Sequence, residues 1–437
     1  MNSVPKTFRV KSFGCQMNVY DGERMAELLG ANGMSAAGEG EDADLVVLNT
    51  CHIREKAAEK AYSDVGRLRR EDGSKPLIAL AGCVAQAEGV EARRRSPMID
   101  LVVGPQAYHR LPEMLADALK GRRPVDTDMP AISKFDAFPK RRRANPSAFL
   151  TVQEGCDKFC TYCVVPYTRG AEISRPWNDV VDEAQDLVDA GAREIVLLGQ
   201  NVNAWSDGGR GLAELIRQLA GIDGLQRIRY TTSHPADMTD ALIAAHGEVE
   251  KLMPYLHLPV QSGSNRILKA MNRSHTAETY LAILAKVRAA RSDIALSGDF
   301  IVGFPGETEE DFTATLNLVD EVGYASAYSF KYSPRPGTPA ATMEDQIEPE
   351  VMDERLQRLH DRINTHQIAF NRASIGKVTE VLIERRGRLA GQMIGRTPWL
   401  QSVHVETDAL PGEIVPVTLI SAGPNSMAGV TLAEAAT

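Results

Sequence analysis

Short apolar runs alternate with amphipathic helical stretches through most of this 437-residue chain. In its first part the runs are TFRVKSFG, DADLVVLNT, KPLIALAG and DLVVGP, and DGERMAELLGANG between two of them is typical of a helix. Such alternation favours a parallel sheet, because the chain must cross over between neighbouring parallel strands. We therefore predict an α/β protein whose N-terminal part is a doubly wound parallel sheet.

A second series of strand-and-helix units begins near Phe149. Its six apolar runs are FLTVQ, EIVLLGQ, RIRYTTS, YLHLPV, IALSGDFIVGF and AYSFKYS. Six β/α units predict a partial (β/α)6 barrel, in which functional residues lie on the loops at the C-terminal ends of the strands. A long charged helix is expected to follow over about 348–374, with Gly376 as its stop signal.

The last part of the chain has a different pattern. Five short runs, VTEVLIE, LAGQMIGR, SVHVETD, EIVPVTLIS and AGVTLAE, alternate with period two and are separated by Gly and Pro. This pattern predicts a small β-barrel of the OB type. The expected organisation is a domain over 1–123, a Pro-containing basic linker over 124–146, the barrel with its connecting helix over 147–371, and the small barrel over 372–437.

Composition excludes some classes of protein. The net charge of −9 argues against a generally basic nucleic-acid binder, so a surface for RNA must be local. The N-terminus lacks the apolar segment of a signal peptide, and no run of about 18 apolar residues predicts a membrane span. We expect a cytoplasmic protein without a membrane partner, whose six cysteines serve metal binding or catalysis rather than disulfides.

The six cysteines fall into two groups of three. One group forms C-x3-C-x2-C just after a predicted strand, and each member of the other follows a predicted strand of the N-terminal sheet: Cys156, Cys160 and Cys163, and Cys15, Cys51 and Cys83. Because ligands gather at the carboxyl ends of parallel strands, we expect the second group to meet at one edge of the sheet. For that group, buried core cysteines are the alternative interpretation.

Three thiolates do not complete a structural zinc site, which normally has four protein ligands. The nearest histidines in the sequence are His109 and His234. An iron–sulfur cluster is also held by thiolates, and with three of them one iron keeps an open position. The C-x3-C-x2-C group therefore favours a cluster whose open iron binds a substrate.

C-x3-C-x2-C after the first strand of a six-unit β/α barrel resembles the radical S-adenosylmethionine superfamily. The resemblance implies a [4Fe-4S] cluster that binds S-adenosylmethionine and cleaves it to a 5'-deoxyadenosyl radical. DFIVGFPGET at 299–308 is similar to the fifth-strand motif beside the adenine, and GQN at 199–201 stands in the second-strand loop near the methionyl part. The resemblance assigns cofactor contacts to Gly199, Gln200, Asn201, Gln261, Asp299, Gly303, Pro305 and Gly306.

The GFPGET stretch also has a purely structural interpretation. Its glycines and proline suit a tight strand-to-helix turn, and Thr308-x-x-Asp311 predicts a capping box for the next helix. A loop that only reverses the chain is the alternative. A P-loop is disfavoured, because no Gly-Lys-Ser/Thr follows.

Three cysteines ahead of a radical barrel and a TRAM-type barrel after it resemble the methylthiotransferases over nearly the whole chain. NTCHIREKA at 49–57, VPYTRG at 165–170, HLPVQSGS at 257–264 and SPRPGTP at 333–339 resemble the branch acting on tRNA. The resemblance implies a second [4Fe-4S] cluster on the N-terminal cysteines. It also implies conversion of N6-isopentenyladenosine at position 37 of tRNA to its 2-methylthio derivative.

The implied reaction uses two S-adenosylmethionine molecules, one as methyl donor to cluster sulfur and one as radical source. The adenine C2–H has no acidic proton, so a radical carried by the cofactor is needed and no side chain is assigned as a general acid or base. An electron donor such as flavodoxin or ferredoxin is implied as a partner. No dimer interface is evident in the sequence, and a monomer is expected.

Basic side chains in two segments are candidates for contacts with tRNA phosphates. They are Arg141, Arg142 and Arg143 in the expected linker and Arg385, Arg386 and Arg396 in the small barrel. Ordinary solvated charges are the alternative. Ala171 and the segment 398–400 depart from the family pattern, which affects the expected RNA contacts and not the cluster ligands.

Other functions remain open at this stage. The same chemistry on threonylcarbamoyladenosine, or on an aspartate of a ribosomal protein, is disfavoured by the blocks at 49–57 and 261–264. A non-enzymatic RNA-binding protein with structural metal sites is disfavoured because both sets of three cysteines are incomplete as closed sites.

Overall fold

The structure, a computed structural model, describes residues 4–52, 55–70, 73–129, 134–423 and 425–432. The chain divides into two compact units. The first comprises residues 1–141, 154–157 and 163–172, and the second comprises 142–153, 158–162 and 173–437. Within the described ranges, no helix combines the length and the apolar character needed to cross a membrane.

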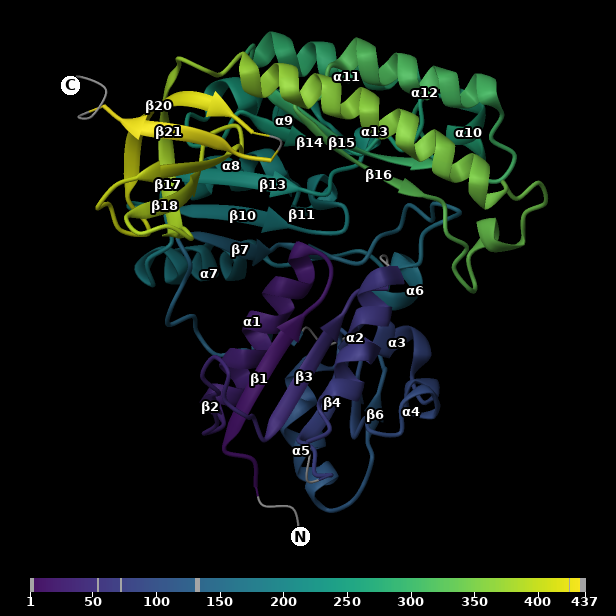
Figure 1. Cartoon of the computed structure of the whole chain (residues 1–437), viewed down its shortest axis with the longest axis vertical. Coiled ribbons are helices and arrows are strands. Elements are labelled where there is room, and N and C mark those ends of the chain that lie inside the picture. Colours follow the sequence, from purple (N-terminus) through teal and green to yellow (C-terminus); the bar gives the residue numbers. More distant parts are fainter. Residues whose placement is uncertain (1–3, 53–54, 71–72, 130–133, 424, 433–437) are drawn as a thin grey trace. The chain divides into compact units, whose positions relative to one another are not determined.

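The first unit is built on a six-stranded parallel sheet with the strand order β2-β1-β3-β4-β5-β6 (Figure 1). The strands are β1 (Thr7–Ser12), β2 (Ser35–Ala36), β3 (Leu45–Thr50), β4 (Leu77–Gly82), β5 (Leu101–Val103) and β6 (Val125–Asp126). The four runs predicted from the sequence are all strands of this sheet. The two-residue strands β2 and β6 were not predicted, since two residues give no periodic signal.

Helices cover both faces of this sheet, as the doubly wound prediction requires. They are α1 (Gln16–Ala31), α2 (Glu55–Arg67), α3 (Cys83–Glu88), α4 (Glu91–Arg95) and α5 (Leu111–Leu119), with the short helices η1 (Tyr108–Arg110), η2 (Lys134–Ala137) and α6 (Val165–Arg169). Alternate residues of β3 point to opposite faces. Leu45 and Val47 join one hydrophobic core, and Val46 and Leu48 join the other.

The segment 124–146 differs from the expected linker. Its start forms β6, which pairs with β5, and the first compact unit extends to Arg141. The Arg141 side chain is buried and forms ion pairs with Glu23 at 2.8 Å and Glu27 at 3.1 Å. The basic composition suggested a solvated segment, but partners more than a hundred residues away in the sequence hold part of it in place.

The second unit contains six parallel strands, in two sheets of order β13-β10-β7 and β14-β15-β16. They are β7 (Ser147–Thr151), β10 (Glu194–Leu198), β13 (Arg227–Thr231), β14 (Tyr255–His257), β15 (Ala295–Val302) and β16 (Ser326–Lys331). The amide of Met253 donates to the carbonyl of Ile228 at 3.0 Å, which joins the approach to β14 to β13. All six predicted runs are these strands, and the partial (β/α)6 barrel is confirmed.

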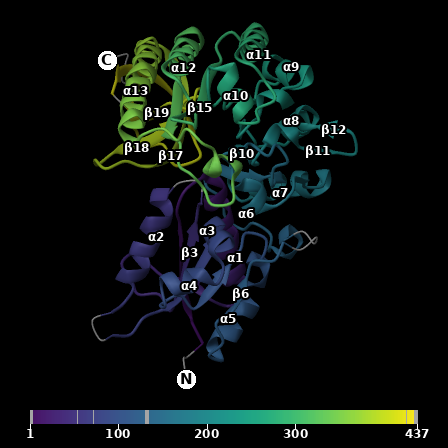
Figure 2. The ribbon, with the colours of Figure 1, turned by 90° about the vertical axis from the view of Figure 1, so that its right-hand side faces the viewer.

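Helices of the second unit lie on the outside of its strands (Figure 2). They are α7 (Trp177–Asp189), α8 (Leu212–Ala220), α9 (Asp240–Glu248), α10 (Asn265–Ala270), α11 (Ala277–Ala290), α12 (Glu309–Val322) and α13 (Pro349–Arg372). The smaller elements are β8 (Gln153–Glu154), β9 (Ile173–Ser174), β11 (Ser206–Asp207), β12 (Arg210–Gly211), η3 (Val202–Ala204), η4 (Pro235–Asp237) and η5 (Pro339–Thr342).

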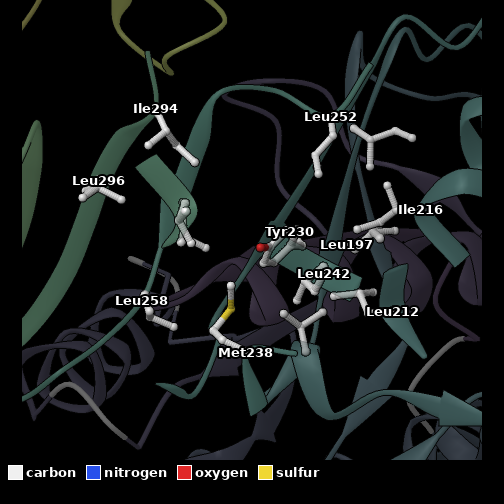
Figure 3. Packing of buried hydrophobic residues seen from close by; sticks show 14 of the residues in the cluster. Leu197, Leu212, Ile216, Tyr230, Met238, Leu242, Leu252, Leu258, Ile294 and Leu296 are labelled. Carbon is white, nitrogen blue, oxygen red and sulfur yellow. The ribbon is translucent and has the colours of Figure 1, made fainter. Parts of the chain in front are cut away.

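The core of the second unit lies between the strands and these helices. Leu197 and Tyr230 from the strands pack with Leu212, Ile216 and Leu242 from α8 and α9 (Figure 3). Because successive strand residues point to opposite sides, the residues that alternate with this set face the barrel interior. Charged residues of β10 and β13 are among those interior residues.

After α13, which confirms the expected long helix, the chain forms a closed five-stranded barrel of order β17-β18-β19-β21-β20. Its strands are β17 (Val378–Arg386), β18 (Gln392–Arg396), β19 (Ser402–Glu406), β20 (Ile414–Ala422) and β21 (Met427–Thr431). They correspond to the five predicted runs. Inward-pointing Val and Ile residues fill this barrel, as period-two alternation requires.

Candidate functional site

The first group of cysteines lies at the C-terminal ends of three adjacent strands. Cys15 precedes α1 directly, Cys51 follows β3, and Cys83 follows β4 as the first residue of α3. Strand order reverses beside β1, with β2 on one side and β3 on the other. Such a switch point is where open α/β sheets bind ligands. The structure therefore brings the three cysteines to one edge of the sheet, as their spacing predicted.

The thiols of this group influence one another. Hydrogen bonding between the Cys15 and Cys51 thiols, together with burial, raises the pKa of Cys15 well above its usual range. Burial also raises the pKa of Cys83, which the Arg169 guanidinium partly offsets. Without a metal the Cys15 and Cys83 thiols hold their protons, which a metal ion displaces on binding.

Glycines and a buried amide pair shape this edge. A Cβ on Gly14, whose φ is +119°, would lie 2.2 Å from the Cys51 Cβ, so only glycine allows the close approach. The Cys15 thiol donates to Asn18 Oδ1 at 3.0 Å, and Asn18 Nδ2 donates to Asn49 Oδ1 at 3.3 Å. No sequence pattern singles out Asn18, because the strand order of the sheet brings its partners to it.

A buried ion network anchors the VPYTRG segment to the first unit. Arg169 pairs with Asp21 at 2.7 Å and with Glu154 at 2.8 Å, and Lys134 pairs with Glu154 at 2.8 Å and Asp21 at 3.4 Å. Two cations and two carboxylates compensate one another where single buried charges would be costly. The network places Arg169 near Cys83, a role that its motif did not reveal.

These residues fit an iron–sulfur cluster in the type of their donor atoms and in their placement at a switch point. In the described ranges, no three His, Cys, Asp or Glu side chains already stand close enough to hold a metal ion. The assignment of Cys15, Cys51 and Cys83 as ligands therefore stays a prediction.

The second group lies on the loop between β8 and α6. Cys156 and Cys163 belong to the first unit and Cys160 to the second. Cys160 is buried, and its Sγ accepts from Arg273 Nη1 at 3.7 Å, while Arg273 Nη2 donates to the carbonyl of Pro259 at 2.6 Å. These contacts hold Cys160 beyond the C-terminal end of β14, where barrels carry their functional residues.

The loop after β10 carries Gly199, Gln200 and Asn201. The Asn201 amide N–H donates to Gln153 Oε1 at 3.0 Å, and its side-chain Nδ2 donates to Asp237 Oδ2 at 2.8 Å. A Cβ on Gly199 would lie 2.6 Å from Gln153 Oε1. Gln153 and Asp237, which sequence reasoning did not assign, thus hold this loop in place.

Gln261 and Asp299 lie together at the end of β14 and on β15. The Gln261 amide donates to the Asp299 carbonyl at 2.9 Å, and Gln261 has a φ of +79°. Asp299 Oδ2 is 3.5 Å from His257 Nε2, and His257 Nδ1 is 3.0 Å from Ser297 Oγ. His257, Ser297 and Asp299 alternate with core residues and so face the barrel interior.

The GFPGET turn follows β15, as its motif predicted. Gly303 has a φ of +72°, and a Cβ there would lie 2.2 Å from Met352 Cγ of α13. Its amide donates to Glu307 Oε2 at 2.8 Å. The predicted capping box at Thr308 and Asp311 is present at the start of α12. Pro305 and Gly306 complete the turn. The close packing of Gly303 against α13 is one structural reason for the glycine in this motif.

The predicted RNA contacts separate into different environments. Arg142, Arg143, Arg385 and Arg386 are exposed, whereas Arg396 is half-buried and lies 3.7 Å from Glu384. Arg141 is buried in its ion pairs, so its prediction as a phosphate contact is corrected. Ile53 and Arg54 of the NTCHIREKA block lie outside the described residues.

Three family profiles match the chain. They are the radical SAM superfamily over 150–319, the uncharacterized protein family UPF0004 over 7–104 and the TRAM domain over 372–432. Curated relatives named tRNA-2-methylthio-N(6)-dimethylallyladenosine synthase match its full length. The relative from Novosphingobium aromaticivorans is 71% identical over 98% of both chains. The one from Zymomonas mobilis is 68% identical over 97% of this chain and 96% of its own.

The chain belongs to the tRNA-2-methylthio-N(6)-dimethylallyladenosine synthase family. A further member, from Cereibacter sphaeroides, is 61% identical over 99% of this chain and all of its own length. The three profiles follow the same order as the sheet, the partial barrel and the small barrel of the structure.

Solved structures share the fold at low identity. The radical S-adenosylmethionine methyltransferase TsrM from Kitasatospora setae is 14% identical, with a TM-score of 0.56 over 77% of this chain and 76% of its own. The cobalamin-dependent radical enzyme OxsB is 13% identical, with a TM-score of 0.54 over 83% of this chain and 56% of its own. At identities this low, the two matches show a shared fold and nothing more.

Proposed function

We propose that this chain converts N6-isopentenyladenosine at position 37 of tRNA to its 2-methylthio derivative. The observation that carries the proposal is full-length identity of 71% to a synthase of this name, with three cysteines in the UPF0004 match and three in the radical SAM match. The chain is a radical S-adenosylmethionine enzyme that uses two [4Fe-4S] clusters and S-adenosylmethionine, and tRNA is its substrate.

We assign Cys15, Cys51 and Cys83 to the auxiliary cluster, and Cys156, Cys160 and Cys163 to the cluster that binds S-adenosylmethionine. When bound, these groups supply the methyl group, the sulfur and the radical that the unactivated adenine C2–H requires. Arg273 donates to the Cys160 sulfur at 3.7 Å, which helps to hold this side chain in place on its loop.

The loops at the barrel mouth orient the cofactor. We propose that Asn201, held by Gln153 and Asp237, and Asp299, held near His257, present fixed polar groups to S-adenosylmethionine. Gly199, Gln200, Gln261, Gly303, Pro305 and Gly306 complete the proposed cofactor contacts. Groups fixed before the ligand arrives lose little entropy on binding, which is the advantage of this arrangement.

The remaining assignments concern partners. We propose that Arg142, Arg143, Arg385, Arg386 and Arg396 contact tRNA phosphates, that flavodoxin or ferredoxin supplies electrons, and that the enzyme acts as a monomer in the cytoplasm, where its tRNA substrate is found. Support for the phosphate contacts is the exposure of four of these arginines and the TRAM match over 372–432.

An anaerobic assay tests the proposed function. Reconstituted and reduced protein is mixed with S-adenosylmethionine and isopentenylated tRNA, and the digested nucleosides are weighed by mass spectrometry while 5'-deoxyadenosine is quantified. A methylthio increment on the modified adenosine is the expected result. Formation of 5'-deoxyadenosine without the increment points to another substrate, and threonylcarbamoylated tRNA and the ribosomal protein are then tested. If neither product forms although the protein carries both clusters, the enzyme assignment is refuted.

A further inference from the structure

Arg169 is a buried cation beside the first group of cysteines, although it belongs to the VPYTRG segment. It is the last residue of α6, and α6 contacts α3, whose first residue is Cys83. The Arg169 side chain is 2% exposed and forms a hydrogen bond with the Cys83 thiol. Both helices belong to the first unit, so this arrangement lies within one compact body.

Two carboxylates fix the guanidinium through different nitrogen atoms. Arg169 Nη2 donates to Asp21 Oδ2 at 2.7 Å, and Nη1 donates to Glu154 Oε1 at 2.8 Å. The Arg169 carbonyl accepts from Gln106 Nε2 at 3.2 Å, and the same amide nitrogen donates to Glu154 Oε2 at 3.2 Å. A planar guanidinium with two anchored nitrogens cannot turn, so its remaining N–H groups keep a fixed direction.

The second buried cation of the network, Lys134, has different surroundings. It pairs with the same two carboxylates, so two cations and two carboxylates balance before any cluster binds. Lys134 Nζ also donates to the Pro105 carbonyl at 3.0 Å, whereas Arg169 reaches Cys83. Arg169 is therefore the cation of this pair that faces the cysteines.

The positive charge of Arg169 acts on two of the three thiols. Burial raises the pKa of Cys83, and Arg169 offsets part of this rise. For Cys15, the hydrogen bond with Cys51 and burial raise the pKa, and Arg169 again acts in the opposite direction. The Asn18 side chain, which also contacts Cys15, is neutral. One fixed cation thus favours negative charge on the sulfur atoms at this edge of the sheet.

Hydrogen bonds to the sulfur atoms and the surrounding charge set the reduction potential of an iron–sulfur cluster. We propose that Arg169 is a positioning residue that acts through Cys83 and raises the reduction potential of the auxiliary cluster. The inference rests on the proposed function, which assigns Cys15, Cys51 and Cys83 to this cluster. Reduction adds one negative charge, and a fixed cation at the Cys83 sulfur stabilises that charge.

The reduction potential matters for the proposed reaction, because the auxiliary cluster takes up one electron in it. The hydrogen atom of adenine C2 leaves with the 5'-deoxyadenosyl radical, and a carbon radical remains. This radical supplies one electron of the new carbon–sulfur bond, and the sulfur–iron bond that breaks supplies the other. The second electron of the sulfur–iron bond stays on the cluster, and a higher reduction potential favours this outcome.

The reduction potential of the auxiliary cluster is measured on the full chain with the other cluster removed. The parent protein is Cys156→Ala/Cys160→Ala/Cys163→Ala, reconstituted with iron and sulfide, and its potential is read from a redox titration followed by EPR. For Arg169→Gln in this parent, we expect the ratio of reduced to oxidised cluster at a fixed potential to fall about tenfold. This fall corresponds to a shift of about 59 mV to lower potential for one electron. Arg169→Lys keeps the charge but loses the fork geometry, and we expect a fall of about threefold.

Lys134→Gln is the matched control, because it removes the other buried cation from the same two carboxylates. We expect this variant to keep the iron content of the parent and to change the ratio less than twofold. Equal shifts in Lys134→Gln and Arg169→Gln, or no shift in the Arg169 variants, overturn the proposal.

Iron content separates tuning of the potential from a merely structural role. If Arg169→Gln takes up no iron, the shift in Arg169→Lys decides the question. Loss of iron from Arg169→Lys as well overturns the proposal, because the network then holds the fold rather than sets the potential. If the parent protein itself forms no cluster, the assignment of the cysteines fails, and the proposed function fails with it.

Discussion

Replacing Arg229 by methionine removes the charge partner of Glu194, at 2.8 Å, while leaving that carboxylate buried. Removing one partner of a buried pair costs about 3–5 kcal/mol. Ser147 Oγ still donates to Glu194 at 2.8 Å, which places this contribution near the lower end of that range. The two lost bonds to the TRAM carbonyls of Thr397 and Pro398 add roughly 1 kcal/mol, because freed carbonyls regain water, so we expect a total of about 4 kcal/mol.

Tryptophan fluorescence measures this loss in the right part of the molecule. All three tryptophans, Trp177, Trp205 and Trp399, belong to the second unit, so urea unfolding followed by their emission reports on that unit. The double variant Glu194→Gln/Arg229→Met should recover about half of the loss, because the unpaired buried charge is gone. A loss below about 1 kcal/mol for Arg229→Met, the range of exposed pairs, would falsify the reasoning.

Further expected outcomes concern acid stability, the auxiliary cluster and the cofactor. Burial lowers the pKa of His246 from 6.5 to about 4, so its neutral form stabilises the fold and the unfolded chain takes up the proton first as pH falls. The free energy of unfolding should therefore fall by roughly 3 kcal/mol between pH 6.5 and 4, and His246→Gln should show a flatter pH profile. Gly14→Ala should lose half of the iron that the wild-type protein takes up on reconstitution, because the added Cβ collides with Cys51. Gly33→Ala is the matched control: Gly33 has a φ of +86° and open space around it, and this variant should keep all of the iron. Asp237→Ala frees the loop after β10, and we expect a raised KM for S-adenosylmethionine with the iron content retained; lost iron instead would assign Asp237 to cluster assembly.

The location of strands, helices and thiols followed from local pattern. Period-two alternation and apolar runs predicted the long strands of the N-terminal sheet, the partial barrel and the small barrel, because the burial of one or both strand faces sets the order of apolar and polar residues along a strand. The spacing of Cys15, Cys51 and Cys83 predicted one sheet edge, because parallel strands all end on the same side. GFPGET predicted its turn and the capping box at Thr308 for the same local reason.

Side-chain partners far apart in the sequence depended on the tertiary structure. Arg141 lies in a segment with the composition of a solvated linker. Its side chain is nevertheless buried in ion pairs with Glu23 and Glu27, which belong to a helix more than a hundred residues earlier in the chain. Two other sets of contacts also join residues that are far apart in the sequence. Arg169 forms an ion pair with Asp21, and Asn201 is hydrogen-bonded to Gln153 and Asp237.

The sequence by itself thus determined the elements, their order and the two sets of thiols, because these depend on spacing within one strand, turn or helix. Only the tertiary structure decided which charges pair and where the TRAM barrel attaches. Arg227 and Arg229 read as ordinary strand residues, and their carbonyl acceptors lie more than 150 residues further along the chain. A buried cation is stable only where the fold brings acceptors to it, and that requirement leaves no periodic trace in the sequence.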